Sequence, residues 1–112
     1  MPEASPEDAK LLTLARSARA RTGAVEGAAV RDGTGRTYVA STVALPSLRL
    51  SAVQAVVAAA VSSGSDTLEA VAVVGPLAAL TDGDRAVLAD LSVTTVLLAG
   101  PDGALRDAGV TP

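Results

Sequence analysis

The sequence of 112 residues lacks histidine, cysteine, tryptophan, phenylalanine, isoleucine and asparagine. Without cysteine, the protein has no disulfide framework, no thiolate nucleophile and no thiolate ligand for a metal. Without histidine, it lacks the commonest general base and the commonest transition-metal ligand of proteins. The composition therefore excludes a Ser-His-Asp triad, and we expect no catalytic residue, no metal and no other cofactor.

Long apolar runs are also missing. The longest is the short run that includes Val56 to Val61, well below the roughly 18 residues of a membrane-spanning helix. Residues 1–8 are acidic and lack the basic and then apolar layout of a signal peptide. We therefore expect a cytoplasmic protein without a membrane partner.

The chain has no excess of positive charge. Nine Lys and Arg stand against twelve Asp and Glu, and Tyr38 is the only aromatic residue. Nucleic-acid binding relies on clustered positive charge and on rings that stack on bases, so we expect no nucleic-acid partner. Arg16, Arg19 and Arg21 form a small basic run, which fits either the C-terminal dipole of a helix or a phosphate-binding patch.

Small aliphatic side chains are abundant. Apolar residues make up 49% of the chain, and all but two of them are Ala, Val or Leu. A chain of this length buries roughly two-thirds of the surface that its unfolded form exposes. We therefore expect residues 1–112 to form a single domain.

The first helix has the clearest sequence signals. Ser5 is a good N-cap, Pro6 fits the first helical position, and Gly23 is suited to end the helix. Four apolar residues recur at helical spacing and predict one buried stripe; they are Leu11, Leu14, Ala15 and Ala18.

The remaining segments predict strands alternating with helices. We expect strands at 24–30, 36–42, 68–74 and 92–99, helices at 48–61 and 85–91, and a short edge strand or a loose end in the last nine residues. The helix at 48–61 is apolar almost all round, which is typical of a helix buried between layers or against another subunit. The order α-β-β-α-β-α-β predicts an α/β fold, a three-layer α/β/α sandwich with a mixed sheet.

This order and these spacings resemble the small cytidine deaminase family over residues 7 to 107. The matching pieces are Gly27-Ala28-Ala29, the Asp32-Gly33 turn, Tyr38, Ser51-Ala52-Val53-Gln54, the strand at 68–74, and Asp84-Arg85 with Asp90-Leu91. In that family a zinc-bound water attacks C4 of cytosine while a Glu shuttles protons.

The resemblance also implies where the chemistry should lie. The family has Cys or His, then Ala, then Glu at the start of its second helix, and Pro-Cys-x-x-Cys-Arg at the start of its third. The second-helix ligand falls on Ser51 and the proton-shuttling Glu on Val53. The two third-helix cysteines fall on Thr81 and Asp84.

Of the other positions in the family pattern, one keeps the family's residue and the rest do not. The Arg is kept as Arg85, and the Pro before the first cysteine falls on Leu80. The family's pyrimidine-reading Asn and Glu fall near Thr42 and Ala44. The resemblance therefore implies a degenerate member without zinc ligands, acid/base Glu or base-reading pair.

The residues at these positions also have a purely structural interpretation. Two hydroxyls and one carboxylate are a poor ligand set for zinc and for hard cations. Ser51 and Thr81 are good N-caps, and Asp84 follows Thr81 at the position of a capping box. Val53 can fill space but cannot carry a proton, and Gln54 can anchor a ligand in a cleft or satisfy a local backbone group.

Three functions follow from these expectations. The first is a catalytically inactive cytidine deaminase-like protein that acts through association, as a homo-oligomer such as a dimer or tetramer or with an unknown protein partner. The second is a non-catalytic module that binds a nucleoside or nucleotide. The third is an active cytidine deaminase, which the missing ligands disfavour, since fold does not imply function.

Overall fold

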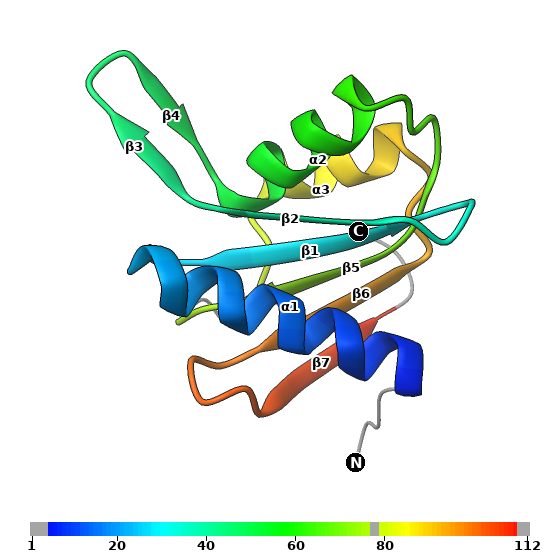
Figure 1. Cartoon of the computed structure of the whole chain (residues 1–112), viewed down its shortest axis with the longest axis horizontal. Coiled ribbons are helices and arrows are strands. Elements are labelled where there is room, and N and C mark those ends of the chain that lie inside the picture. The colour runs from blue at the N-terminus through cyan, green and yellow to red at the C-terminus, as the bar shows by residue number, and fades with distance from the viewer. Residues whose placement is uncertain (1–4, 77–78, 110–112) are drawn as a thin grey trace.

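The computed structural model describes residues 5–76 and 79–109 as three layers (Figure 1). A mixed sheet in the order β2-β1-β5-β6-β7 has α1 on one face and α2 and α3 on the other. The elements are α1 (Pro6–Thr22), β1 (Gly27–Asp32), β2 (Thr37–Ser41), β3 (Val43–Leu45), β4 (Leu48–Leu50), α2 (Ala52–Ser62), β5 (Leu68–Val74), α3 (Asp82–Asp90), β6 (Thr95–Ala99) and β7 (Leu105–Gly109). The predicted α/β/α sandwich is confirmed.

The direction of the strands follows from their connections. β5 and β6 are parallel because α3 crosses between them, and the other pairs of the sheet are antiparallel. The strands expected at 24–30 and 36–42 correspond to β1 and β2, which pair as an antiparallel hairpin. Apart from the exposed Glu69, β5 is buried along its whole length, as expected for a strand covered on both faces.

The first helix forms largely as the sequence predicts. Ser5 Oγ accepts a 3.2 Å hydrogen bond from the Asp8 N–H, and Gly23 ends the helix with a φ of 67°. Leu11, Ala15 and Ala18 are buried, but Leu14 is 37% exposed. The buried stripe is therefore narrower than predicted, since Leu14 lies at its margin and stays partly in contact with solvent.

The predicted helix at 48–61 was wrong at its start. Residues Leu48–Leu50 form β4, which pairs with β3 in a separate two-stranded hairpin, and the helix begins at Ala52. The hydroxyl of Ser51 accepts a hydrogen bond from the Gln54 N–H, which makes Ser51 the boundary of the helix. The hairpin extends away from the three layers (Figure 1).

The ends of other elements also differ from the prediction. The last strand of the predicted order begins at Thr95 rather than at residue 92, since the chain turns after α3. The last nine residues supply the edge strand β7, with residues 110–112 outside the described part. Pairing with β6 holds β7 in the sheet.

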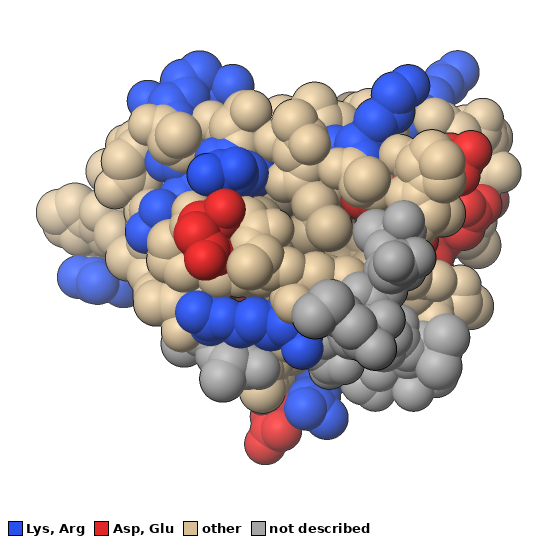
Figure 2. All heavy atoms as spheres, turned by 90° about the horizontal axis from the view of Figure 1, so that it is seen from below, with Lys and Arg blue, Asp and Glu red and all other residues tan. Residues whose placement is uncertain are grey.

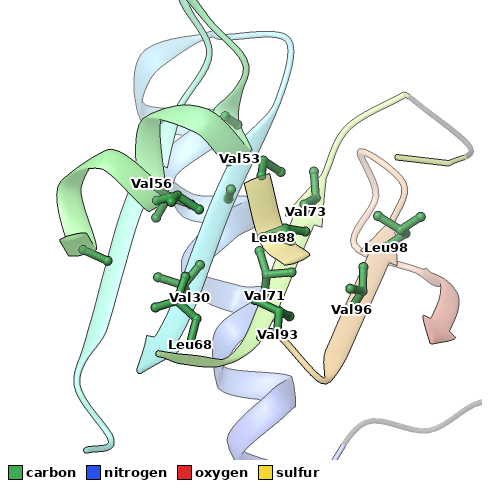
Figure 3. Packing of buried hydrophobic residues seen from close by; sticks show 14 residues of the cluster. Val30, Val53, Val56, Leu68, Val71, Val73, Leu88, Val93, Val96 and Leu98 are labelled. Atoms are coloured by element: carbon green, nitrogen blue, oxygen red, sulfur yellow. The ribbon is translucent and has the colours of Figure 1, made fainter. Parts of the chain in front are cut away.

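Two apolar clusters lie on opposite faces of the sheet. One joins α2, α3 and the sheet and is shown in Figure 3; the other joins α1 and the sheet. The apolar helix α2 buries Val53, Val56 and Val57, while Val61 stays 47% exposed. Part of its apolar surface therefore faces solvent.

Charged side chains on the α1 side lie among groups of the opposite sign. Figure 2 shows acidic residues among the basic ones on the face that it presents. Arg31 of β1 pairs with Asp8 at 2.9 Å and with Glu69 at 2.8 Å. Arg19 and Arg21 lie in the last turn of α1, where positive charge complements the helix dipole.

None of the helices in residues 5–76 and 79–109 combines the length and the apolar character that crossing a membrane requires.

Candidate functional site

The N-termini of α2 and α3 meet at one edge of the sheet. Gly27 at the start of β1 pairs with Val74 at the end of β5, so the chain before β1 and the chain after β5 lie side by side. A 2.6 Å hydrogen bond from Ser51 Oγ to Asp84 Oδ1 joins the two helices at this edge. The topology thus gathers residues that are far apart in the sequence.

Ser51 and Gln54 form a complete capping box at the start of α2. The Gln54 N–H donates to Ser51 Oγ at 3.0 Å, and the Ser51 N–H donates to Gln54 Oε1 at 2.9 Å. Two backbone donors that would otherwise be unpaired are satisfied reciprocally. Of the two interpretations of Gln54, the structure supports the local backbone partner.

Thr81 caps α3, but Asp84 does not complete a capping box. Thr81 Oγ1 accepts the Asp84 N–H at 3.1 Å, as the sequence predicts. The carboxylate of Asp84 instead accepts the hydroxyl proton of Ser51 and is only 4% exposed. Asp84 thus connects α3 to α2 instead of completing the cap of its own helix.

Val53 is fully buried in the first turn of α2. It belongs to the same apolar cluster as Val73 and Leu88 (Figure 3). The space around it is filled by aliphatic carbon, which agrees with its predicted role in packing.

The other predicted site positions separate into two groups. Thr42 and Ala44 line a pocket of about 360 Å³ together with Ser51. Arg85 is exposed and does not line this pocket. We call this cavity the hairpin pocket; its lining residues are Val25, Glu26, Thr42, Val43, Ala44, Arg49, Leu50 and Ser51.

Glu26 is the site residue that the sequence analysis missed. It directly precedes β1 and is only 6% exposed. Its N–H donates to Thr42 Oγ1 at 3.1 Å, and its carbonyl accepts the Thr42 N–H at 3.1 Å. The available signal was a lone carboxylate inside the otherwise aliphatic segment 24–30.

The environment of Glu26 disfavours its charged form. Burial raises the pKa of the Glu26 carboxyl above its ordinary value, and the nearby negative charge of Asp84 raises it further. One acidic side chain just before β1 and one in the first turn of α3 therefore share this edge of the sheet.

The side chains at the implied zinc positions do not fit zinc. Ser51 and Thr81 offer neutral hydroxyls, both engaged in hydrogen bonds, and Asp84 is the only carboxylate among the three. Zinc in proteins prefers thiolate and imidazole ligands. Within the described residues, no three His, Cys, Asp or Glu side chains are grouped so as to hold a metal ion.

A family model described as cytidine deaminase-like matches residues 4–103. None of the curated proteins matches the chain significantly.

Several solved structures share the fold. A cytidine deaminase from Burkholderia pseudomallei is 23% identical, with 90% of each chain covered and a TM-score of 0.78. A mutant cytidine deaminase from Mycobacterium tuberculosis is 30% identical, with 87% of each chain covered and a TM-score of 0.67. Another structure of the M. tuberculosis enzyme is 28% identical, covers 92% of this chain and 90% of that one, and has a TM-score of 0.69.

Proposed function

This chain belongs to the cytidine deaminase-like family, and we propose that it is a member without zinc-dependent catalysis that acts through association with a second copy or another protein. The observation that carries the proposal is the hydrogen bond between Ser51 and Asp84. Through this bond, two of the three implied zinc-ligand positions are bonded to each other where the N-termini of α2 and α3 meet.

The loss of catalysis is supported at each implied position. Ser51 and Thr81 serve as helix caps, and Val53 is packed in the core. A valine cannot exchange a proton, and no imidazole or thiolate exists in the chain to hold zinc. We derive no reaction step for this site.

Association is supported by apolar side chains on the β3–β4 hairpin. Leu45 is 54% exposed and Leu48 is 49% exposed, and the two residues are paired across the strands. A two-stranded hairpin with little packing of its own is marginally stable in water. A second molecule that covers these leucines would remove apolar area from water and hold the hairpin in place.

The two halves of the proposal are tested separately. For catalysis, the purified protein is incubated with zinc and cytidine, and both bound zinc and uridine are measured. We expect neither stoichiometric zinc nor uridine, and the appearance of both would refute the loss of catalysis.

For association, mass in solution is measured for the wild type and for the double variant Leu45→Ser/Leu48→Ser. We expect a wild-type oligomer that the double variant weakens, while Leu14→Ser on the distant helix α1 leaves it intact. A wild-type monomer would refute the homo-oligomer. The association proposal would then survive only if one defined partner bound through the same two leucines.

A nucleoside-binding module is the second candidate, and the hairpin pocket is the observation that favours it. The pocket brings Ser51 together with Thr42 and Ala44. Tyr38 instead packs against the core cluster, so no aromatic ring of the described residues stacks on a base there. Thermal unfolding with a panel of nucleosides tests this candidate, and an unchanged midpoint throughout would eliminate it.

A further inference from the structure

We propose that the hairpin pocket binds a small organic monocation, an ammonium or amidinium group carried on an apolar body, through the carboxyl of Glu26. The ligand class follows from the carboxyl of Glu26, from the space beside Gly75 that the Glu26 side chain occupies, and from the walls of the pocket. The inference is independent of the association proposed above.

Glu26 as a whole is only 6% exposed, and none of the hydrogen bonds or ion pairs found among the described residues reaches its carboxyl. Buried polar groups in folded proteins nearly always have partners, and a desolvated carboxylate without one is unfavourable. The only fully enclosed side-chain polar atom without a partner in the described chain is Arg31 Nη1. Neither carboxyl oxygen of Glu26 is such an atom, so the carboxyl keeps some contact with solvent, and Glu26 lines the hairpin pocket. A ligand there can replace water as its hydrogen-bond donor.

Gly75 provides the space for the Glu26 side chain. A Cβ atom at Gly75 would lie 2.8 Å from Glu26 Cγ and 3.0 Å from the carbonyl oxygen of Val25. Because such approaches are too close for real Cβ atoms, the side chain can take this position only beside a glycine. The local backbone thus holds the carboxyl at the edge where α2 and α3 begin.

The charge at this edge favours a cation over a neutral ligand. Asp84 is buried near Glu26, and its Oδ1 atom already accepts a hydrogen bond from the Ser51 hydroxyl. Two neighbouring acidic groups make this place favourable for positive charge. Within the described residues, no three His, Cys, Asp or Glu side chains are grouped to hold a metal ion, whereas an ammonium group needs only acceptors for its N–H donors.

The walls of the pocket define the rest of the ligand. Val25, Val43 and Leu50 supply apolar surface, which suits a short alkyl or aryl body. A volume of about 360 Å³ is at the small end of ligand pockets. The exposed Arg49 also lines the pocket, and its positive charge disfavours a second cationic group, so the ligand should carry one charge.

The test is an amide NMR titration of the full-length protein with benzylamine, benzamidine and the neutral analogue benzyl alcohol. We expect saturable shifts at Glu26, Thr42 and Ser51 with a Kd of about 1 mM or lower for the two cations, and none for benzyl alcohol. Glu26→Gln keeps the shape but removes the charge, and it should weaken binding at least about tenfold. Glu69→Gln, an exposed carboxyl outside the pocket, should leave binding unchanged.

Gly75→Ala is the second variant, because it displaces the Glu26 side chain without changing any charge. It should weaken benzylamine binding while the spectrum of α1 stays that of the folded protein. Equal binding of benzyl alcohol, undiminished binding by Glu26→Gln, or no saturable shift with either cation would overturn the proposal. Saturable binding of magnesium or zinc chloride at Glu26 in place of the amines would overturn it as well.

Discussion

The hydroxyl of Ser51 donates a 2.6 Å hydrogen bond to the carboxylate of Asp84 and thereby joins the first turns of α2 and α3. Each helix also has its own cap, made by Ser51 and Thr81. The bond from Ser51 to Asp84 is therefore an additional, tertiary interaction between the two helices. It fixes the relative position of two helices that are otherwise connected through the sheet.

The first prediction is that Ser51 and Asp84 are energetically coupled. Ser51→Ala should lower the free energy of unfolding by about 1 kcal/mol through loss of the cap and further through loss of the cross-helix bond. In a double-mutant cycle with Asp84→Ala, measured by urea unfolding, we expect a coupling of about 1.5 kcal/mol or more for a charge-assisted bond.

Ser5→Ala is the matched control, because Ser5 caps α1 without contacting Asp84. Its effect should add to that of Asp84→Ala within about 0.5 kcal/mol. Additivity for the Ser51 pair as well would show that the bond between the helices does not form in solution.

The second prediction concerns zinc. If Ser51, Thr81 and Asp84 stand where the family places its ligands, the variant with cysteine at all three positions should bind one zinc ion per chain. Three thiolates at converging helix ends form a zinc site with one open position. The zinc content per chain after dialysis measures this. With cobalt in place of zinc, the thiolate-to-cobalt absorption band measures the same site. A variant with cysteines at positions 51 and 81 alone should bind weakly, and a metal-free triple variant would contradict the assignment.

The local signals at helix starts were predictable from sequence. Ser5, Ser51 and Thr81 each cap a helix as expected, because a cap depends on residues within one turn. The start of the helix at 48–61 was wrong, since leucines at positions 48 and 50 fit a strand or a buried helix equally well. The β3–β4 hairpin that decides between them is fixed by pairing, not by composition.

The site was predictable only in part. The positions of Ser51, Thr81 and Asp84 came from the resemblance to the cytidine deaminase family. The bond from Ser51 to Asp84 and the closeness of Glu26 to Gly75 depend on the order of strands in the sheet. Contacts between residues that are distant in the chain leave no periodic signal in a single sequence.

The third prediction is a pH dependence that comes from Glu26. Its pKa is raised in the folded protein by burial and by the negative charge of Asp84. The other charged residue that lines the same pocket is Arg49. The folded state therefore holds the proton more tightly than the unfolded state. This contribution stabilises the fold below pH 4.5 and is lost as the pH rises through the raised pKa.

Glu26→Gln removes this titration. The variant should therefore gain stability relative to the wild type between pH 4.5 and neutral pH, as measured by urea unfolding at several pH values. Glu7→Gln in the exposed first turn of α1 controls for the loss of one negative charge. A difference between Glu26→Gln and the wild type that is constant with pH would contradict the raised pKa.

The fourth prediction has the opposite sign and concerns Asp32 at the β1–β2 turn. Its carboxylate accepts hydrogen bonds from Thr34, Ser65 and the Arg36 backbone, which lower its pKa to about 2. The stabilisation is present above the ordinary value of 3.8 and is lost as the pH falls towards 2. Asp32→Asn should unfold at a lower temperature than the wild type at neutral pH, and this difference should vanish near pH 2.

The fifth prediction tests the contact between α1 and the sheet. At Gly27 a Cβ atom would overlap the carbonyl oxygen of Ala15 and lie 2.7 Å from the Arg19 nitrogen. Both are backbone atoms of a helix and cannot move aside alone, so Gly27→Ala should destabilise the protein by about 3 kcal/mol or more. Gly83→Ala is the control, because its nearest neighbour is Thr81 Oγ1 at 3.9 Å and Ala favours a helix over Gly by about 1 kcal/mol. Thermal unfolding should therefore move in opposite directions for the two variants, and a wild-type midpoint for Gly27→Ala would show that α1 does not pack this closely on β1.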